Sequence, residues 1–154
     1  MVRPLQMTKL SVIMLFSVLL FSCGKQEKGL GRYGMLADNT PDYAAVTFMD
    51  CIYNDKNIDR ALALSSESMV RILTRYHSNR NVQRHIINLR YDEVTITPQG
   101  SNKIGRNQYA EEATVTLFFT GIYNDDKIED LRTVKLIRED GYWKVDRIDP
   151  DHFM

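Results

Sequence analysis

The sequence offers few side chains that could bind a metal ion. Its histidines are His77, His85 and His152, and their separations do not match ligand spacings such as His-x-x-x-His. The two cysteines, Cys23 and Cys51, do not form the Cys-x-x-Cys pair of a structural zinc site. We therefore predict no metal site and no cofactor.

Catalytic signatures are also missing from the sequence. It contains neither a glycine-rich phosphate loop nor a Gly-x-Ser-x-Gly nucleophile elbow. His85 shares a predicted helix face with three apolar residues, Val82, Ile86 and Leu89. A buried histidine with a hydrogen-bond partner explains this placement more simply than a catalytic one. Cys51 flanks another apolar helix face, which favours a buried thiol over one that pairs between chains.

Three residues remain as candidates for ligand binding: His85, Tyr123 and Trp143. Trp143 is expected on the inward face of a sheet with Arg138 opposite, where a cation–π contact contributes roughly 0.5–1 kcal/mol. An enzymatic interpretation would require ionisable groups such as His85 and Tyr123 to meet in one cavity.

Basic residues suggest no nucleic-acid site. Arg71, Arg75, Arg80 and Arg84 are best explained as a solvated face, with a patch for phosphate, lipid headgroups or an acidic partner as the alternative. The chain has 20 basic and 20 acidic side chains, and removing residues 1–22 leaves 18 against 20. A charge near −2 gives no general attraction to nucleic acids.

The first 22 residues have the pattern of an export signal. Arg3 and Lys9 precede an apolar stretch over residues 10–21. These 12 residues suit a signal peptide and are fewer than the roughly 20 that a membrane-spanning helix needs. A plain secretory signal and a short membrane anchor remain the alternatives.

The end of this stretch points to lipidation. Its residues Leu20-Phe21-Ser22-Cys23-Gly24 resemble the lipobox of bacterial lipoproteins. The resemblance implies a signal peptide over residues 1–22 and an acylated Cys23 as the mature N-terminus. Several acyl chains give firm anchoring, because each buried methylene contributes about 0.8 kcal/mol. Gly24 in place of Asp implies the outer membrane, facing the periplasm, if the organism is Gram-negative.

Residues 23–39 are expected to form a lipidated flexible tether. Glycines are scattered among charged residues there without hydrophobic periodicity. A flexible chain of this length has an rms reach of roughly 20–24 Å. The folded domain, residues 40–154, would therefore lie close to the membrane.

The domain is expected to begin with helices. Thr40-Pro41 indicates an N-cap and a proline at the first helical position. The apolar face of this helix is Ala45, Phe48, Met49 and Ile52. A break at residues 54–57 precedes a short segment near Ile58, Ala61 and Leu62, and Ser65 or Ser66 caps the next helix. That helix presents Met69, Ile72, Leu73 and Tyr76, and Val82, Ile86 and Leu89 indicate one or two further turns.

From residue 91 the hydrophobic period changes to two, which predicts strands over residues 91–97, 113–120, 128–138 and 142–148. Residues 124–127 form a loop, and Asp140-Gly141 a primed hairpin turn. This register places Leu136 opposite Val145, Val134 opposite Arg147, Lys135 opposite Asp146, Leu117 opposite Val134 and Val115 opposite Leu136. The inward face is then Val115, Leu117, Val134, Leu136, Trp143 and Val145, interrupted by Arg132, Arg138 and Arg147. The outward face is Thr114, Thr116, Lys135, Ile137, Lys144 and Ile148.

The fold class is therefore α+β, with N-terminal helices packed on a curved four-stranded antiparallel sheet. The order of elements and the final strand Gly141-Tyr142-Trp143-Lys144-Val145 resemble the nuclear transport factor 2-like (cystatin-like) superfamily, in particular its small exported lipoproteins. The resemblance covers roughly residues 40–149. It implies a cone with a pocket at its open end and, in some members, isomerase or dehydratase activity or a homodimer through the sheet.

Together these observations favour a lipid-anchored envelope protein that binds a small hydrophobic ligand or an envelope protein without catalysis. An isomerase- or dehydratase-type enzyme and a homodimeric scaffold are the alternatives. No nucleic-acid partner is expected.

Overall fold

The computed structural model describes residues 39–99 and 110–150 of the 154-residue chain. The chain divides into two units, Met1–Arg32 and Tyr33–Met154, and all described residues belong to the second. The predicted signal peptide, Cys23 and the tether up to residue 38 lie outside the described residues. Because every buried apolar residue reported below belongs to Tyr33–Met154, this unit carries its own hydrophobic core.

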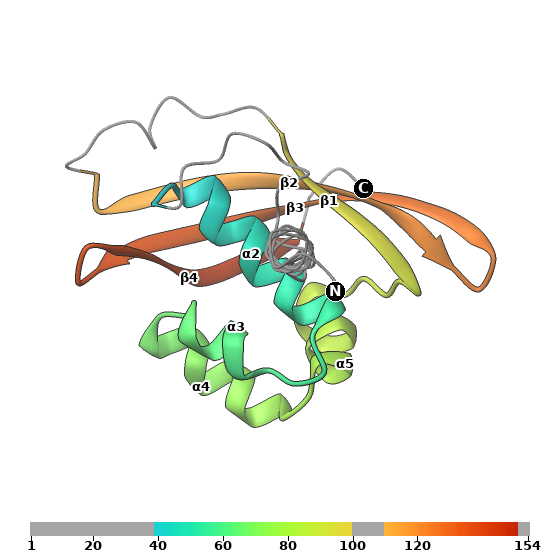
Figure 1. Ribbon diagram of the computed structural model, residues 1–154, viewed down its shortest axis with the longest axis horizontal. Coiled ribbons are helices and arrows are strands. Elements are labelled where there is room, and N and C mark those ends of the chain that lie inside the picture. The colour runs from blue at the N-terminus through green and yellow to red at the C-terminus, as the bar shows by residue number, and fades with distance from the viewer. Residues whose placement is uncertain (1–38, 100–109, 151–154) are drawn as a thin grey trace, which may run out of the picture. The chain divides into compact units, whose positions relative to one another are not determined.

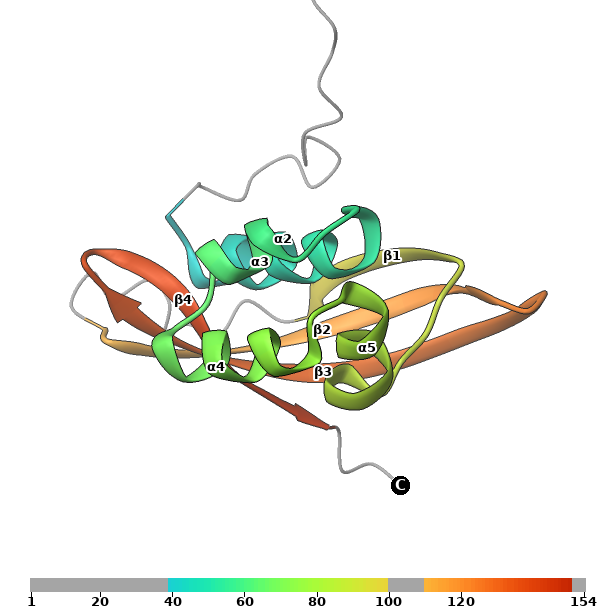
Figure 2. The same ribbon diagram turned by 90° about the horizontal axis from the view of Figure 1, so that it is seen from below.

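The domain is α+β, with helices packed against an open antiparallel sheet (Figures 1 and 2). The helices are α2 (Pro41–Asn54), α3 (Asp59–Ala63), α4 (Glu67–Tyr76), α5 (Asn79–Val82) and the π-helix η3 (Gln83–Ile87). The strands are β1 (Glu93–Gln99), β2 (Glu112–Tyr123), β3 (Asp126–Glu139) and β4 (Tyr142–Pro150), in the order β1-β2-β3-β4. The predicted fold class is confirmed.

Helix α2 is the central helix and contacts all four strands. Its predicted start is confirmed, because Thr40 Oγ1 accepts a hydrogen bond from the amide of Tyr43 at 3.3 Å and Pro41 follows the cap. The predicted apolar face is confirmed as well, since each of its members is fully buried: Ala45, Phe48, Met49 and Ile52.

Helix α4 lies against β4 at the edge of the sheet. Ser66 caps it, with its hydroxyl oxygen 3.2 Å from the amide of Met69. Met69 and Leu73 are buried as predicted, but Ile72 is 39% exposed. The buried face of α4 is therefore narrower than the sequence predicts, because an edge position covers less of a helix than the centre of a sheet does.

The segment after α5 is a π-helix, which the sequence does not predict. Val82 is buried, and the next fully buried residue is Ile87, five positions later, while Ile86 is only half-buried. A π-turn has one residue more than an α-turn, so the inward position moves from residue 86 to residue 87. His85 is consequently exposed, and its predicted burial is wrong.

The β2–β3 turn is shorter than predicted. Asn124 and Asp125, with φ of 51° and 68°, form a two-residue turn instead of a loop over residues 124–127. Val115 therefore pairs with Val134, and Leu117 with Arg132. The two predicted β2–β3 pairs are wrong, but a shift of two residues keeps each side chain on its predicted face.

Strand β4 contains a β-bulge at Asp146. Leu136 pairs with Val145 as predicted, and the Asp140-Gly141 turn is confirmed with φ of 52° and 83°. Beyond the bulge, Lys135 pairs with Arg147, and Val134 with Ile148, so the predicted Lys135–Asp146 and Val134–Arg147 pairs are wrong.

The bulge also changes which side chains face the helices. Ile148 is buried, although the sequence predicts it on the outward face, while Arg147 is exposed instead of inward. The six apolar residues predicted on the inward face are all buried: Val115, Leu117, Val134, Leu136, Trp143 and Val145.

Candidate functional site

Two pockets are each lined in part by residues of the π-helix η3. The first, the hairpin pocket, has a volume of about 470 Å³ and is lined by Arg84, Asn88, Leu89, Arg90, Tyr123 and Ile128. The second, the bulge pocket, measures about 410 Å³ and combines apolar Met69, Ile72, Ile86 and Ile148 with polar Ser68, His85, Asp146 and Arg147. Single π-turns are frequent at functional sites, so η3 and its two pockets form the candidate site.

The bulge pocket is organised around Asp146. Ser66 Oγ and Ser68 Oγ donate hydrogen bonds to Asp146 Oδ1 at 2.7 and 2.6 Å. The hydroxyls of Ser68 and then Ser66 lower the pKa of Asp146 below its usual value, so the carboxylate stays charged. Because the bulge turns Asp146 toward the helices, it joins β4 to the first turn of α4.

His85 lies at the edge of the bulge pocket. Its ring stacks on Tyr76, with 5.7 Å between ring centroids. The extra residue of the π-turn brings His85 to this exposed position, away from the core.

Tyr123 lies in the hairpin pocket. The guanidinium carbon of Arg90 is 4.6 Å from the centre of its ring, a cation–π contact. Arg84 lines the same pocket from η3. The structure thus places Tyr123 beside two positive charges, of which the sequence had named only Arg84, as one of four arginines of a possible basic patch.

Trp143 lines neither pocket. It is 5% exposed, and the guanidinium carbon of Arg138 lies 5.8 Å from its ring centre, as the predicted cation–π pair requires. The three predicted ligand residues are therefore not brought together: His85 and Tyr123 line different pockets, and Trp143 packs in the core.

Arg132 is the residue that holds η3 in place. It is 6% exposed, and its Nε donates to the carbonyl oxygen of Ile87 at 2.8 Å. Its Nη1 also forms a 2.8 Å ion pair with Asp130. A cation at the end of a helix satisfies carbonyl oxygens that have no partner within the helix. The sequence signal for this role is an arginine on an otherwise apolar strand face.

Aromatic side chains fill the space between α2 and the sheet next to Arg132. The ring centroid of Tyr53 lies 5.8 Å from that of Tyr91 and 5.9 Å from that of Phe119. Tyr53 donates to the carbonyl oxygen of Leu89 at 3.0 Å, and the hydroxyl of Tyr91 is buried without a hydrogen-bond partner among the described residues. Burial raises the pKa of Tyr53, and it raises that of Tyr91 to about 12, so both phenols stay neutral at ordinary pH.

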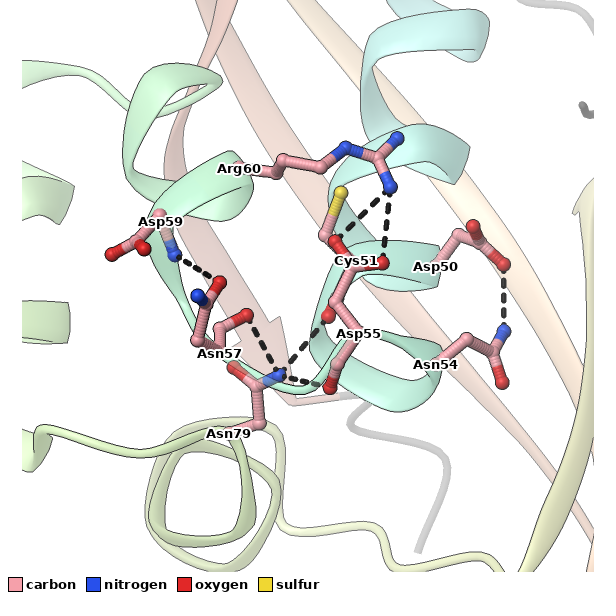
Figure 3. A network of polar contacts seen from close by, with 8 residues as sticks. All are labelled: Asp50, Cys51, Asn54, Asp55, Asn57, Asp59, Arg60 and Asn79. Atoms are coloured by element: carbon pink, nitrogen blue, oxygen red, sulfur yellow. Dashed lines mark hydrogen bonds and ion pairs between the residues drawn. The ribbon is translucent and has the colours of Figure 1, made fainter.

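Cys51 is buried at the end of α2, as predicted. Burial raises the pKa of its thiol to about 11, which disfavours the reactive thiolate. Figure 3 shows the polar network around it, in which Asn79 Nδ2 donates to the carbonyl oxygens of Cys51, Asp55 and Asn57 at 3.2, 2.9 and 3.1 Å. These bonds fix the chain where α2 ends.

Within residues 39–99 and 110–150, no helix is long and apolar enough to cross a membrane. No group of three His, Cys, Asp or Glu side chains in the same ranges could hold a metal ion.

Comparison of the chain with protein-family models, curated proteins and solved structures finds no match.

Proposed function

We propose that this protein is a bacterial envelope lipoprotein, anchored through a lipid on Cys23, whose domain binds a small ligand or a partner protein without catalysis. The observation that carries the binding role is the pair of pockets beside η3, each of which combines apolar side chains with fixed polar groups. The pattern of residues 20–24 supports the anchor. In a Gram-negative organism, the resemblance to bacterial lipoproteins with Gly rather than Asp after the cysteine favours the outer membrane, facing the periplasm.

Binding is favoured over an isomerase or dehydratase activity by the arrangement of the ionisable groups. His85 and Tyr123, which an enzyme would need in one cavity, line different pockets. Such activity in a cone also needs an open interior, and the space beneath α2 is filled by Tyr53, Tyr91 and Phe119.

The domain's relationship to the nuclear transport factor 2-like superfamily is part of the same proposal. Helices followed by the four-stranded order β1-β2-β3-β4 support it. Within that family the ligand site would be displaced, from the interior of the cone to the surface of η3.

A homodimeric scaffold is the second candidate, and the outer face of the sheet favours it. Phe118 and Leu131 pair on that face and are both half-buried, and Ile122, also on it, is 46% exposed. An exposed apolar strip of this kind is typical of surfaces that bind another protein.

Metabolic labelling with palmitate tests the anchor. The wild-type chain is expected to incorporate label and to sediment with membranes, whereas Cys23→Ser is expected to lose the label. Cys51→Ser is the matched control and should label normally. Equal labelling of wild type and Cys23→Ser would contradict lipidation at Cys23.

A further inference from the structure

The hairpin pocket carries two positive charges and no negative one. Arg84 and Arg90 line it together with Asn88, Leu89, Tyr123 and Ile128. Within residues 39–99 and 110–150, neither arginine forms an ion pair, whereas Arg60, Arg71 and Arg132 each pair with a carboxylate. A cleft lined by one sign of charge concentrates ions of the opposite sign.

The Arg90 guanidinium and the backbone at the end of η3 are held in position before any ligand arrives. The Arg90 guanidinium rests on the Tyr123 ring at 4.6 Å. Asn88, in the left-handed conformation with φ of 55°, ends η3, and Arg132 holds the carbonyl oxygen of the preceding Ile87. A preorganised site loses less conformational entropy on binding.

The acidic groups nearby at the hairpin end are mostly engaged elsewhere. Asp92 Oδ2 accepts a hydrogen bond from the amide of Asn124 at 2.9 Å, and Glu129 pairs with Lys127. Asp126, opposite Tyr123 in the register, does not line the pocket. The two guanidinium groups therefore face the pocket without a competing carboxylate on its wall.

The remaining wall of the pocket is apolar. Leu89 is buried, with 8% of its surface exposed, and Ile128 is half-buried on strand β3. A volume of about 470 Å³ is within the range of small-molecule sites. Guanidinium groups bind carboxylate and phosphate with paired hydrogen bonds.

We infer that the hairpin pocket binds the anionic head, a carboxylate or a phosphate monoester, of a small amphiphile whose apolar part packs on Leu89 and Ile128. Arg84 and Arg90 bind the anion, and Tyr123 positions Arg90. This inference rests on the proposed binding function and names its ligand class.

Titration of the unit Tyr33–Met154, which carries its own core, with octyl phosphate and octanoate by amide NMR tests the inference. We expect saturable shifts at Asn88, Arg90 and Tyr123 for at least one of the two. Arg84→Gln and Arg90→Gln should each weaken that affinity at least tenfold, and Arg75→Gln, an exposed arginine outside both pockets, should leave it within twofold. Octanol, the neutral probe, should not bind.

Further binding measurements identify the source of the anion. They also distinguish a failure of this inference from a failure of the proposed binding function. Inorganic phosphate should bind more weakly than octyl phosphate. Equal affinity for the two would contradict the inference that the apolar part of the ligand packs in the pocket. If the domain sediments with phosphatidate vesicles and octyl phosphate reverses this, the anion is a lipid headgroup. If the domain does not sediment with the vesicles, the anion belongs to a free amphiphile. Binding of octanol, or unchanged affinity in both Gln variants, would overturn the inference. A neutral compound that copurifies with the protein and occupies the hairpin pocket would also overturn the inference, while leaving the proposed binding function intact.

Discussion

The Nε of Arg132 donates to the carbonyl oxygen of Ile87 at 2.8 Å, joining β3 to the end of η3 across 45 positions of the sequence. This bond fixes the end of the segment that lines both pockets. Arg132 also pairs with Asp130, so one buried side chain links the sheet, the π-helix and a carboxylate.

Arg132→Met is expected to lower the free energy of unfolding by about 3 kcal/mol. The substitution leaves the carbonyl oxygen of buried Ile87 without its donor and also removes the ion pair with the partly exposed Asp130. Urea unfolding of Tyr33–Met154 measures the change. Arg71→Met, which removes an exposed ion pair, should change stability by less than about 0.5 kcal/mol. Equal effects of the two substitutions would contradict this role of Arg132.

Asp146→Asn is expected to destabilise the domain by about 1 kcal/mol at neutral pH, because it weakens the hydrogen bonds from Ser66 and Ser68. The pKa of Asp146 is lowered on folding, chiefly by the Ser68 hydroxyl and then by that of Ser66. The charged Asp146 carboxylate therefore contributes its full stabilisation above its pKa in the unfolded chain, about 4. This stabilisation is lost as the pH falls through the lower pKa of the folded state.

Denaturant unfolding at a series of pH values measures this contribution. The difference between wild type and Asp146→Asn should shrink below about pH 4. Asp126→Asn, at the exposed first residue of β3, is the control and should differ little from wild type. A difference that stays constant down to about pH 3 would rule out the charged carboxylate as its cause.

Gly121→Ala is expected to cost about 2 kcal/mol or more. A Cβ at this position would come within 2.2 Å of the carbonyl oxygen of Glu93 and 2.7 Å of the Tyr91 ring, so β1 or the ring must move. Thermal unfolding monitored by near-ultraviolet circular dichroism measures both the stability and the packing of Tyr91. Gly141→Asn separates steric overlap from backbone strain: a Cβ there meets no atom within 4 Å, so any loss of stability comes from the positive φ of 83°. Wild-type stability in Gly121→Ala would contradict the close packing.

Cys51 is expected to resist alkylation in the folded domain, because it is fully buried and its thiol pKa is about 11. Iodoacetamide modification of Tyr33–Met154, followed by mass spectrometry, should be slow in buffer and rapid in urea. Cys51 is the only cysteine of this unit, which makes the assignment direct. Rapid modification of the native protein would show that the end of α2 opens readily.

Much of the fold could be predicted because its local signals agree with its packing. Thr40-Pro41 begins α2, and the buried face of that helix repeats at helical spacing. Asp140-Gly141 supplies the two positive φ values of a primed turn, which fixes the start of β4.

The candidate site was harder to predict because it depends on two one-residue irregularities. The π-turn before Ile87 and the bulge at Asp146 each insert a residue into an otherwise regular period. A prediction from periodicity assumes regular spacing through such insertions. It therefore put His85 in the core and Ile148 on the outward face of the sheet, contrary to the structure. The partners of Arg132 also come from distant segments, and no local pattern specifies them.

Native mass spectrometry of Tyr33–Met154, produced with export to the periplasm, tests the binding role most directly. We expect either a mass above that of the polypeptide, from a bound small molecule that is lost on unfolding, or a complex with a different protein. A monomer or homodimer that carries no ligand and captures no partner from the envelope would contradict it.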